Sequence, residues 1–514
     1  MLLQVAALHQ LGSLTSRLGT VTTSLLTDSS LKLLDTVFSG LLSPWLAVRL
    51  ASSQCLRHVS SAVPSVLTPL IDKSAEALEN YKGSAEAVSG YSSGLAGLLG
   101  AVRVTPNGIP HTRGKVIFNC GEELLRSASQ SSRLSRDRTK AGWLLIGNWS
   151  PGGVIHFTDA LISGSIMSLG SSVVRGLLPR CMLLWRNAFP RSSKELESEK
   201  ARGDAFTWQV SLEARAGALA SIHSFVTSCP DLVTEDITRR LGVPLEAALS
   251  LLTLLASSNS PIKAYSGQLK APTATVRLRL LEVISVLPAS TLETSYAGLL
   301  RLLVSEFCLS DPTTSPTSCS LLTSLLHQDD LLLLQGAASV PDQLEAGLED
   351  QVTSAVSGSH ALEHDHTWLY RAQPDTGVTG GQVTGAPPLG VAVIDLSVLV
   401  FGKIFPRAAH KHRLQMLTHF QDCIKAAKAA KLEVLQINIF TALLSGLKGI
   451  VEDKVSFGGT EVVSAAVSLI GPALTSTNPQ LRCAAGECLG RIAQVNNYFV
   501  EIEELGVRVP TRQS

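Results

Sequence analysis

A Gly-x-Ser-x-Gly pattern is the first motif in this sequence whose residue types could do chemistry. Gly90-Tyr91-Ser92-Ser93-Gly94 matches the turn that presents the nucleophilic serine of many hydrolases. That turn requires a strand before the serine and a helix after it, but residues 84–88, which precede it, have helical periodicity. We therefore predict that Ser92 lies in an ordinary helix. A hydrolase built on Ser92 is the enzymatic alternative.

A histidine-rich stretch contains residue types that could bind a metal ion. Its members are His360, Glu363, His364, Asp365 and His366. Metal binding needs fixed geometry, and the composition around these residues is that of a loop, so we predict a solvated polar segment. Residues 377–385 are glycine-rich but lack the Gly-Lys-Ser/Thr ending of a P-loop, which favours a linker. The sequence thus predicts no catalytic, cofactor-binding or metal-binding residues and no cofactor.

The cysteines indicate reduced and mostly buried thiols. They are odd in number, widely scattered and never spaced as Cys-x-x-Cys, which favours neither a disulfide framework nor a zinc site. The nine are Cys55, Cys120, Cys181, Cys229, Cys308, Cys319, Cys423, Cys483 and Cys488.

Positive charge gathers in two places, although the net charge of the chain is only +1. The first cluster is Arg126, Arg133, Arg136, Arg138 and Lys140, and the second is Lys403, Arg407, Lys411 and Arg413. Neither is interleaved with aromatic residues that could stack on bases, so no nucleic-acid partner is predicted. We expect solvated faces, with contact to acidic partner segments or phosphoinositide headgroups as the alternative.

The elements that carry these residues are predicted to be helices. The chain has 514 residues, of which 45% are hydrophobic and only 5% aromatic, so small aliphatic side chains must fill its core. Apolar residues recur at helical spacing almost throughout, and no convincing hairpin signal occurs. Segments with this pattern include 31–42, 46–59, 67–81, 84–102, 121–129, 166–189, 212–227, 244–257, 275–286, 292–308, 318–327, 413–429, 432–451, 460–474 and 479–495.

Several of these helices resemble one another. Residues 48–56 match residues 481–489, with an apolar residue, an arginine and then small or apolar residues, and 214–219 and 276–281 are looser copies. Small residues let helices approach closely, and we expect the arginine to hydrogen-bond toward the preceding turn. The spacing from Arg49 to Arg215 and from Arg277 to Arg482 corresponds to repeats of about 41 residues, within the range of HEAT and armadillo repeats. The interval from Arg215 to Arg277 does not fit this spacing, so irregular repeats or a longer loop must intervene there. The alternative is a non-repetitive helical domain.

The predicted fold is therefore an all-α, armadillo-like α-solenoid of HEAT-type helix pairs. We assign one solenoid segment to residues 1–337, with an irregular insertion at 148–165, and a second to residues 393–495. Between them, 338–392 reads as a flexible acidic and Gly/Pro-rich loop, and 496–514 is an unpatterned tail.

The sequence also favours a cytosolic protein. Its N-terminus makes a poor signal peptide because it lacks a basic region and its apolar run is interrupted. The most apolar later stretch, residues 389–401, contains Asp395 and is too short to span a bilayer, so no transmembrane helix is predicted.

Six longer motifs are more specific than a general repeat pattern. Residues 108–115 read GIPHTRGK, 183–192 read LLWRNAFPRS and 199–210 read EKARGDAFTWQV. Residues 361–365 read ALEHD, 412–417 read HRLQML and 482–487 read RCAAGE. Together they resemble the HEAT repeat-containing protein 5 family of very large cytosolic α-solenoids, over about residues 1–495. Residues 148–165 and 496–514 depart from the family pattern, and we expect a partial or alternatively spliced chain.

This resemblance implies a non-enzymatic scaffold in vesicle trafficking. Members of the family associate with the clathrin adaptor complex of the trans-Golgi network and endosomes and with aftiphilin and synergin-type cofactors, and a link to dynein is known. They support endosome-to-Golgi and Golgi-to-plasma-membrane transport, endocytosis and protein localisation, and reach membranes only through partners. The resemblance transfers no site residues. A HEAT scaffold for nuclear transport or phosphatase assembly is the alternative with the same fold.

Overall fold

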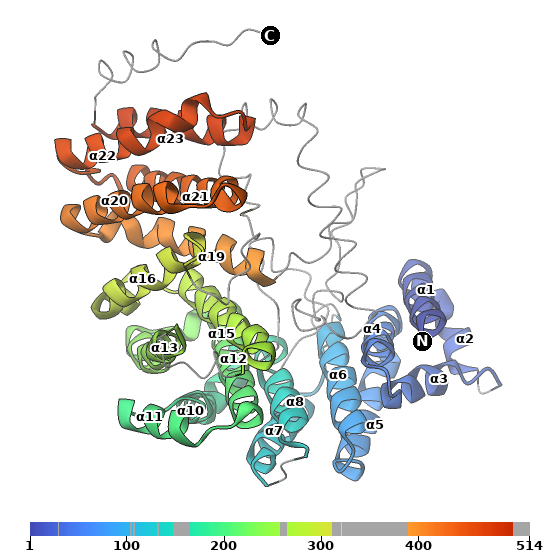
Figure 1. The fold of residues 1–514 in the computed structure, drawn as a ribbon. Coiled ribbons are helices and arrows are strands. Elements are labelled where there is room, and N and C mark those ends of the chain that lie inside the picture. The colour runs from blue at the N-terminus through green and yellow to red at the C-terminus, as the bar shows by residue number, and fades with distance from the viewer. Residues whose placement is uncertain are drawn as a thin grey trace. The chain divides into compact units, whose positions relative to one another are not determined.

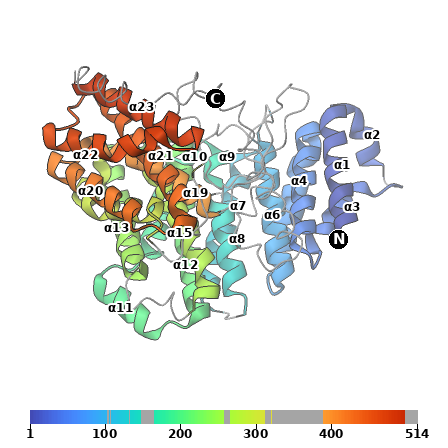
Figure 2. The same ribbon diagram turned by 45° about the horizontal axis from the view of Figure 1, so that its top comes forward.

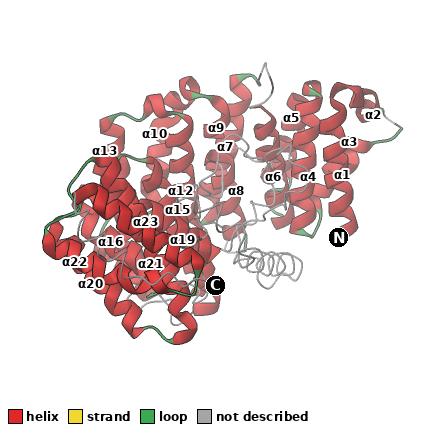
Figure 3. Cartoon of the chain, turned by 90° about the horizontal axis from the view of Figure 1, so that it is seen from above, coloured by secondary structure: helices red, strands yellow, loops and turns green. Residues whose placement is uncertain are grey.

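Every regular element in the described part of the chain is a helix (Figure 3). The computed structural model describes residues 1–28, 30–102, 105, 108–130, 133–147, 165–256, 265–310, 320 and 389–496. No strand occurs within these stretches, and the predicted all-α fold is confirmed. The chain forms two compact units. Unit 1 holds described residues 1–251 and 265–286, and unit 2 holds 252–256, 287–310, 320 and 389–496.

Unit 1 contains the helices from α1 to α15, joined by short turns. They are α1 (Leu2–Leu18), α2 (Thr23–Thr27), α3 (Leu33–Ser39), α4 (Leu46–Ala62), α5 (Leu67–Asn80), α6 (Ala85–Val102), α7 (His111–Ala128), α8 (Ser135–Gly147), α9 (Ser165–Leu169), α10 (Ser171–Asn187), α11 (Ser193–Arg202), α12 (Ala205–Ser228) and α15 (Ser266–Val286). Helix α13 (Glu235–Ala256) crosses from unit 1 into unit 2. The 3₁₀ helix η2 (Gly40–Leu42) lies before α4.

Unit 2 contains the remaining helices of the described chain. They are α16 (Tyr296–Phe307), α19 (Leu389–Ile404), α20 (His410–Ala426), α21 (Ala429–Asp453), α22 (Thr460–Ile470) and α23 (Pro479–Asn496), with 3₁₀ helices η6 (Ala289–Ser295), η9 (Phe405–Arg407) and η10 (Gly471–Thr475).

In unit 1, helices pack in a row by skipping one or more neighbours in the chain. Helix α4 packs between α1 and α6, α6 against α8, α8 against α12, and α12 against α15. Figures 1 and 2 show α1, α4 and α6 lying in this order. The intervening helices α5 and α7 pack against α6 and α8. Unit 2 follows the same rule, since α19 packs on α16 and α21, α21 on α23, and α20 on α22.

Glycines allow the close approach of α6 to α4 and η2. A Cβ atom added at Gly90 would lie 1.7 Å from the carbonyl oxygen of Leu41, and one at Gly97 would lie 2.5 Å from that of Ser53. Real Cβ atoms do not approach oxygen so closely, so only glycine fits either position. Both glycines lie outside the four Arg-containing segments for which the sequence predicted close approach through small residues.

One arginine contact recurs in the two helices with matching sequences. Arg49 of α4 donates from Nη1 to the carbonyl oxygens of Ser43 (2.7 Å) and Pro44 (3.1 Å). Arg482 of α23 donates from Nη1 to the carbonyl oxygens of Ser476 (2.6 Å) and Thr477 (3.0 Å). Each arginine thus binds the turn before its own helix at the same sequence offset, as the pattern predicts.

The looser copy at Arg215 behaves differently. Its Nη2 pairs with Glu199 Oε2 on α11 at 2.5 Å, and its side chain is buried. The expected contact with the preceding turn is therefore replaced by an ion pair between helices α11 and α12. The preceding helix offers a carboxylate here, and a carboxylate is a stronger acceptor for guanidinium than a carbonyl group.

Two helices of unit 2 are long and apolar enough to cross a membrane by length and composition alone. They span Leu389–Arg407, which is α19 with η9, and Ala429–Asp453, which is α21. The first is longer than the 389–401 stretch considered from the sequence. Most of each is buried in the structure, and Asp395 accepts a 2.7 Å hydrogen bond from the Ser320 hydroxyl. Burial in the core is sufficient to explain their composition.

Element boundaries differ from the sequence prediction where glycine or proline intervenes. The predicted helix 166–189 is two helices, α9 and α10, because Gly170 has a left-handed backbone (φ 74°) between them. Helix α7 begins after Pro110, ten residues before the predicted start. The end of the predicted 338–392 loop is also wrong, since α19 begins at Leu389.

Candidate functional site

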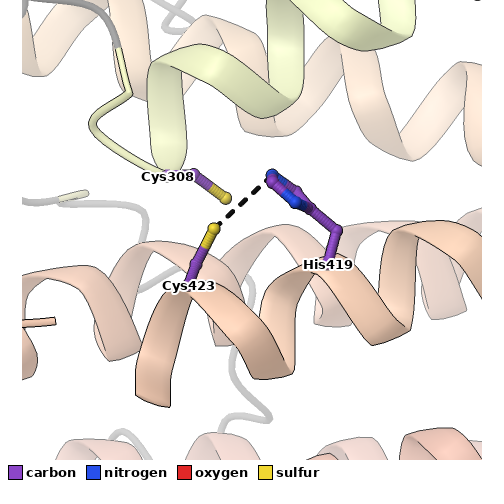
Figure 4. Close-up of side chains that lie close together, drawn as sticks. All are labelled: Cys308, His419 and Cys423. Atoms are coloured by element: carbon purple, nitrogen blue, oxygen red, sulfur yellow. Dashed lines mark hydrogen bonds between the residues drawn. The ribbon is translucent and has the colours of Figure 1, made fainter. Parts of the chain in front are cut away.

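The strongest cluster of reactive side chains in the described chain lies in unit 2, where α16 ends beside α20. Cys308, His419 and Cys423 bring two sulfur atoms and an imidazole nitrogen within 4.8 Å of one another. The Cys423 sulfur lies 3.4 Å from Nε2 of His419. Figure 4 shows the three side chains pointing toward one another, with Cys308 from one helix and the other two from α20.

The backbone holds Cys308 at the C-cap of α16. The next residue, Leu309, has a left-handed conformation (φ 52°). Its amide donates to the Glu306 carbonyl (3.1 Å), and the amide of Ser310 donates to the Ser305 carbonyl (2.9 Å). This pair of hydrogen bonds is a Schellman motif, which fixes the end of the helix. Cys308 is therefore part of a well-defined helix end and not of a loose loop.

Aromatic rings beside the cluster fix the two helices against each other. Phe307 precedes Cys308, Phe420 follows His419, and their ring centroids are 5.7 Å apart in an edge-to-face arrangement. Both rings also contact Phe401 of α19 at 5.3 and 6.3 Å. All three rings are buried, and their contacts hold the end of α16 against α20 beside the two cysteines and the histidine.

The two cysteines are electrostatically unequal. The hydrogen bond with Cys423 and burial both raise the pKa of Cys308, whereas accepting that bond lowers the pKa of Cys423 despite its partial burial. Of the two thiols, Cys423 is therefore the more readily ionised. At Cys55 burial alone acts and raises the pKa to about 12. The eight cysteines that the structure describes carry free sulfur atoms, and five of them are buried.

Ser92 is placed where no nucleophile elbow can form. It lies inside helix α6 and its side chain is fully buried. The flanking glycines serve packing, since a Cβ at Gly94 would meet Leu41 Cδ1 at 2.9 Å, as Gly90 meets the Leu41 backbone. The geometry required of a hydrolase serine, a strand followed by a sharp turn, is absent from this stretch.

The first basic cluster mostly serves internal contacts in unit 1. Arg136 and Lys140 of α8 both reach Glu213 of α12, at 2.9 and 3.3 Å. Burial lowers the pKa of Lys140, and Glu213 opposes that shift. Arg138 donates to the carbonyl oxygens of Ser127 (3.0 Å) and Lys82 (3.1 Å). These residues hold helices together, so the expectation of a solvated face is wrong for them.

The second basic cluster contains one buried arginine and three exposed residues. Arg413 is buried and donates four hydrogen bonds to carbonyl groups, those of Phe405 (3.2 Å), Pro406 (2.5 Å), Ser456 (2.5 Å) and Phe457 (2.8 Å). It thus joins η9 to the segment after α21. Lys403, Arg407 and Lys411 are exposed, as predicted.

A shallow cleft of about 550 Å³ lies on unit 1 between α5, α7 and α10. Its charged side chains already pair within the cleft or at its edge. Arg180 bonds to Asn119 (2.9 Å) and pairs with Glu122, and Arg126 pairs with Glu123. No charge complementary to a ligand is left over among these residues.

Other sequence candidates lie outside the described residues. These are His360, Glu363, His364, Asp365 and His366, the glycine-rich stretch 377–385, and Cys319. Most of the 148–165 insertion, the 338–392 loop and the 496–514 tail also lies outside them.

The cluster of Cys308, His419 and Cys423 was not predicted from the sequence. The helical His-x-x-x-Cys spacing of residues 419 and 423 was a signal, since it places both on one helix face. Cys308 had no such signal because it is distant in sequence. Comparison with known proteins adds no further assignment: no family model matches the chain, and no solved structure is significantly similar to it.

Proposed function

We propose that this chain is a non-enzymatic HEAT-type α-solenoid scaffold in clathrin-adaptor-dependent transport between endosomes, the Golgi and the plasma membrane. The observation that carries the architecture is the shared contact of Arg49 and Arg482 with the turn before each helix. Equivalent side chains making equivalent contacts are what a repeat predicts. The row packing of α1, α4, α6 and α8 agrees with it.

The trafficking role rests on the resemblance to the HEAT repeat-containing protein 5 family. Several motif residues in the described chain stabilise helix ends or helix packing. Ser192 caps α11 by accepting from the Glu195 amide (3.3 Å), and Asp204 caps α12 by accepting from the Thr207 amide (2.7 Å). Trp185 is buried and donates to the Ser221 hydroxyl at 2.9 Å. The resemblance thus reaches residues that determine the fold, which supports its extension to the scaffold role.

The turn before α4 carries three exposed apolar side chains, and we propose it as a docking surface for partner segments. Leu42, Trp45 and Leu46 are 43%, 56% and 42% exposed, and we call these three residues the α4 turn surface. Exposed tryptophan is the residue type that most often dominates binding energy at interfaces. We assign this surface to a short hydrophobic segment of the adaptor complex or of its aftiphilin or synergin-type cofactors. Several such weak contacts along a scaffold gain strength through avidity.

Purified components test this proposal directly. The whole chain is titrated with purified adaptor complex and, separately, with the cofactors, and binding is measured by calorimetry. We expect the double variant Leu42→Ala/Trp45→Ala to bind more than about tenfold more weakly, as for loss of a central aromatic contact. The matched control Leu183→Ala/Val243→Ala removes side chains that are 58% and 60% exposed elsewhere in unit 1 and should bind normally.

Two results would contradict the proposal. A folded wild-type chain that binds none of these partners removes the trafficking role. Equal weakening by both double variants shows non-specific adhesion of apolar surface and removes the α4 turn surface as the docking site.

A further inference from the structure

We propose that Cys308, His419 and Cys423 form a binding site for Zn²⁺, which would join the end of α16 to α20. The inference does not depend on the proposed trafficking role. It rests on the convergence of three donor atoms of suitable chemistry from two separate elements of unit 2.

The donor set is the kind that zinc selects. Two thiolates and one imidazole are soft to borderline ligands, and zinc sites of proteins are built mainly from cysteine and histidine. His419 and Cys423 are four residues apart on α20, so both project from the same face of that helix. A third ligand from another element is what turns such a helical pair into a site.

The distances are close to those of a coordinated ion. Zn–S bonds of about 2.3 Å and Zn–N bonds of about 2.0–2.1 Å place tetrahedral ligand atoms roughly 3.5–3.8 Å apart. The sulfur of Cys423 and Nε2 of His419 are 3.4 Å apart, and all three atoms lie within 4.8 Å. Side-chain rotations that move atoms by about 1 Å close the geometry without backbone movement.

The surroundings leave a route for the ion. Cys308 is buried and Cys423 half-buried, whereas His419 is exposed, so the cluster opens to solvent on the histidine side. Phe307 and Phe420 pack behind it at 5.7 Å and hold the two helices in place. Three protein ligands then leave the fourth position to a water molecule from that open side.

Binding is an exchange of protons for metal, with no change of oxidation state. Zn²⁺ displaces the proton of each thiol to the buffer, while neutral His419 donates the lone pair of a ring nitrogen. The alternative chemistry of the two sulfur atoms is a disulfide bond between Cys308 and Cys423. It would release two protons and two electrons and needs an oxidant, and it would leave His419 without a role.

The test uses the full chain, reduced with a phosphine and freed of metal. Zn²⁺ affinity is measured by competition with a chromogenic chelator, and Co²⁺ serves as a spectroscopic substitute. We expect one tight site per chain, with thiolate-to-cobalt charge transfer and intense tetrahedral d–d bands. Cys423→Ala and His419→Ala should each weaken binding by about 100-fold or more, since even outer-shell changes cost 10–100-fold.

Matched controls separate the site from ordinary thiols and histidines. His412→Ala removes an exposed histidine of the same helix, and Cys120→Ala a half-buried cysteine of unit 1, and both should bind Zn²⁺ as the wild type does. A second measurement needs no variant. In the folded wild-type chain, Zn²⁺ should slow alkylation of Cys423 and leave that of Cys120 unchanged.

Three outcomes would overturn the assignment. They are Zn²⁺ binding that survives both Cys423→Ala and His419→Ala, loss of binding that is equal in Cys120→Ala, and a Co²⁺ spectrum without thiolate charge transfer. A reduced chain that binds no Zn²⁺ but forms a Cys308–Cys423 disulfide with diamide would identify a redox pair in place of a metal site.

Discussion

Helix α4 in unit 1 and helix α23 in unit 2 share a sequence pattern and an arginine contact, but their surroundings differ. Helix α4 packs against α1 on one side and α6 on the other, and Gly97 of α6 leaves no room beside the Ser53 carbonyl. Helix α23 packs on α21, η10 and α22, and its own Gly486 and Gly490 are exposed with no described atom within 4 Å of an added Cβ. An added methyl group therefore has no room on α6 where it meets α4, but it has open space on α23.

This difference shows which part of the motif is intrinsic to the helix and which depends on its neighbours. The arginine contact is internal, because it joins each helix to its own preceding turn. The requirement for small residues comes from neighbouring helices, because a glycine is needed only where the backbone of another element approaches it closely. Substitutions can separate the two effects, with the largest consequences expected at the packed glycines.

The largest effect is expected for Gly90→Ala in α6. The added Cβ would overlap the Leu41 carbonyl at 1.7 Å, so α6 must move away from η2. Overpacking of a core costs about 1–3 kcal/mol, and contact with rigid backbone places this change at or above the upper end. Unfolding in denaturant measures the loss. Gly176→Ala on α10, where nothing lies within 4 Å, is the control and should not destabilise the chain.

Arg413→Ala should be the next most damaging change, and it acts in unit 2. The buried guanidinium donates to four carbonyl groups of two segments, and its removal takes one hydrogen bond from each of them, although the Phe405 carbonyl keeps the amide of Ala408 as a donor. We expect a loss of about 2–4 kcal/mol in the free energy of unfolding. Hydrogen exchange should locate the weakening at η9 and at residues 455–458. The exposed Lys411→Ala on the same helix should change neither, and equal effects would contradict a structural role for Arg413.

The arginine contact itself can be compared between the units. Arg49→Ala should cost about 1–2 kcal/mol, and Arg482→Ala about 0.5–1 kcal/mol, because Arg482 is exposed and solvent replaces its hydrogen bonds more easily. Both losses should appear as faster exchange of amides in the first turn of the affected helix. A protected first turn in either variant would show that the shared contact is incidental and would weaken the repeat interpretation.

Acidification should loosen α4 from α1 but leave α23 unaffected. Burial, followed by the nearby Arg57 and His9, lowers the pKa of His58, and burial lowers the pKa of His9. Folded-state pKa values below the unfolded value of about 6.5 mean that the unfolded chain binds more protons, so stability falls as the pH drops through that value. Hydrogen exchange at pH 7.5 and 5.5 should show the change in α1 and α4. His58→Gln should reduce it.

Both helices and their shared arginine contact could be predicted from the sequence, because they depend on a local residue pattern. The apolar-Arg-small pattern of residues 48–56 and 481–489 predicted both helices and the arginine contact. Gly90 and Gly94 were misleading, since their spacing matched a catalytic motif while their role is packing.

Only two of the three residues of the candidate site could be predicted from the sequence to lie together. His419 and Cys423 share a helix face by spacing alone, but Cys308 joins them through the packing of Phe307 on Phe420. No local pattern encodes such a contact between distant segments. The wrong prediction of a solvated basic face for Arg136 and Lys140 has the same cause. Their partner Glu213 lies on α12, far away in the sequence.

The smallest predicted effect is a gain in the free energy of unfolding, and it tests the contrast between α4 and α23 most directly. Gly486→Ala and Gly490→Ala in α23 should each stabilise unit 2 by about 0.5–1 kcal/mol, because alanine restricts the unfolded chain and meets no described neighbour. Gly97→Ala in α6 is the same chemical change, but it should destabilise unit 1, since its Cβ would lie 2.5 Å from the Ser53 carbonyl. Unfolding monitored by hydrogen exchange in each unit gives both signs. If the α23 variants were also destabilising, an additional segment must cover that helix face, and the contrast between α4 and α23 would disappear.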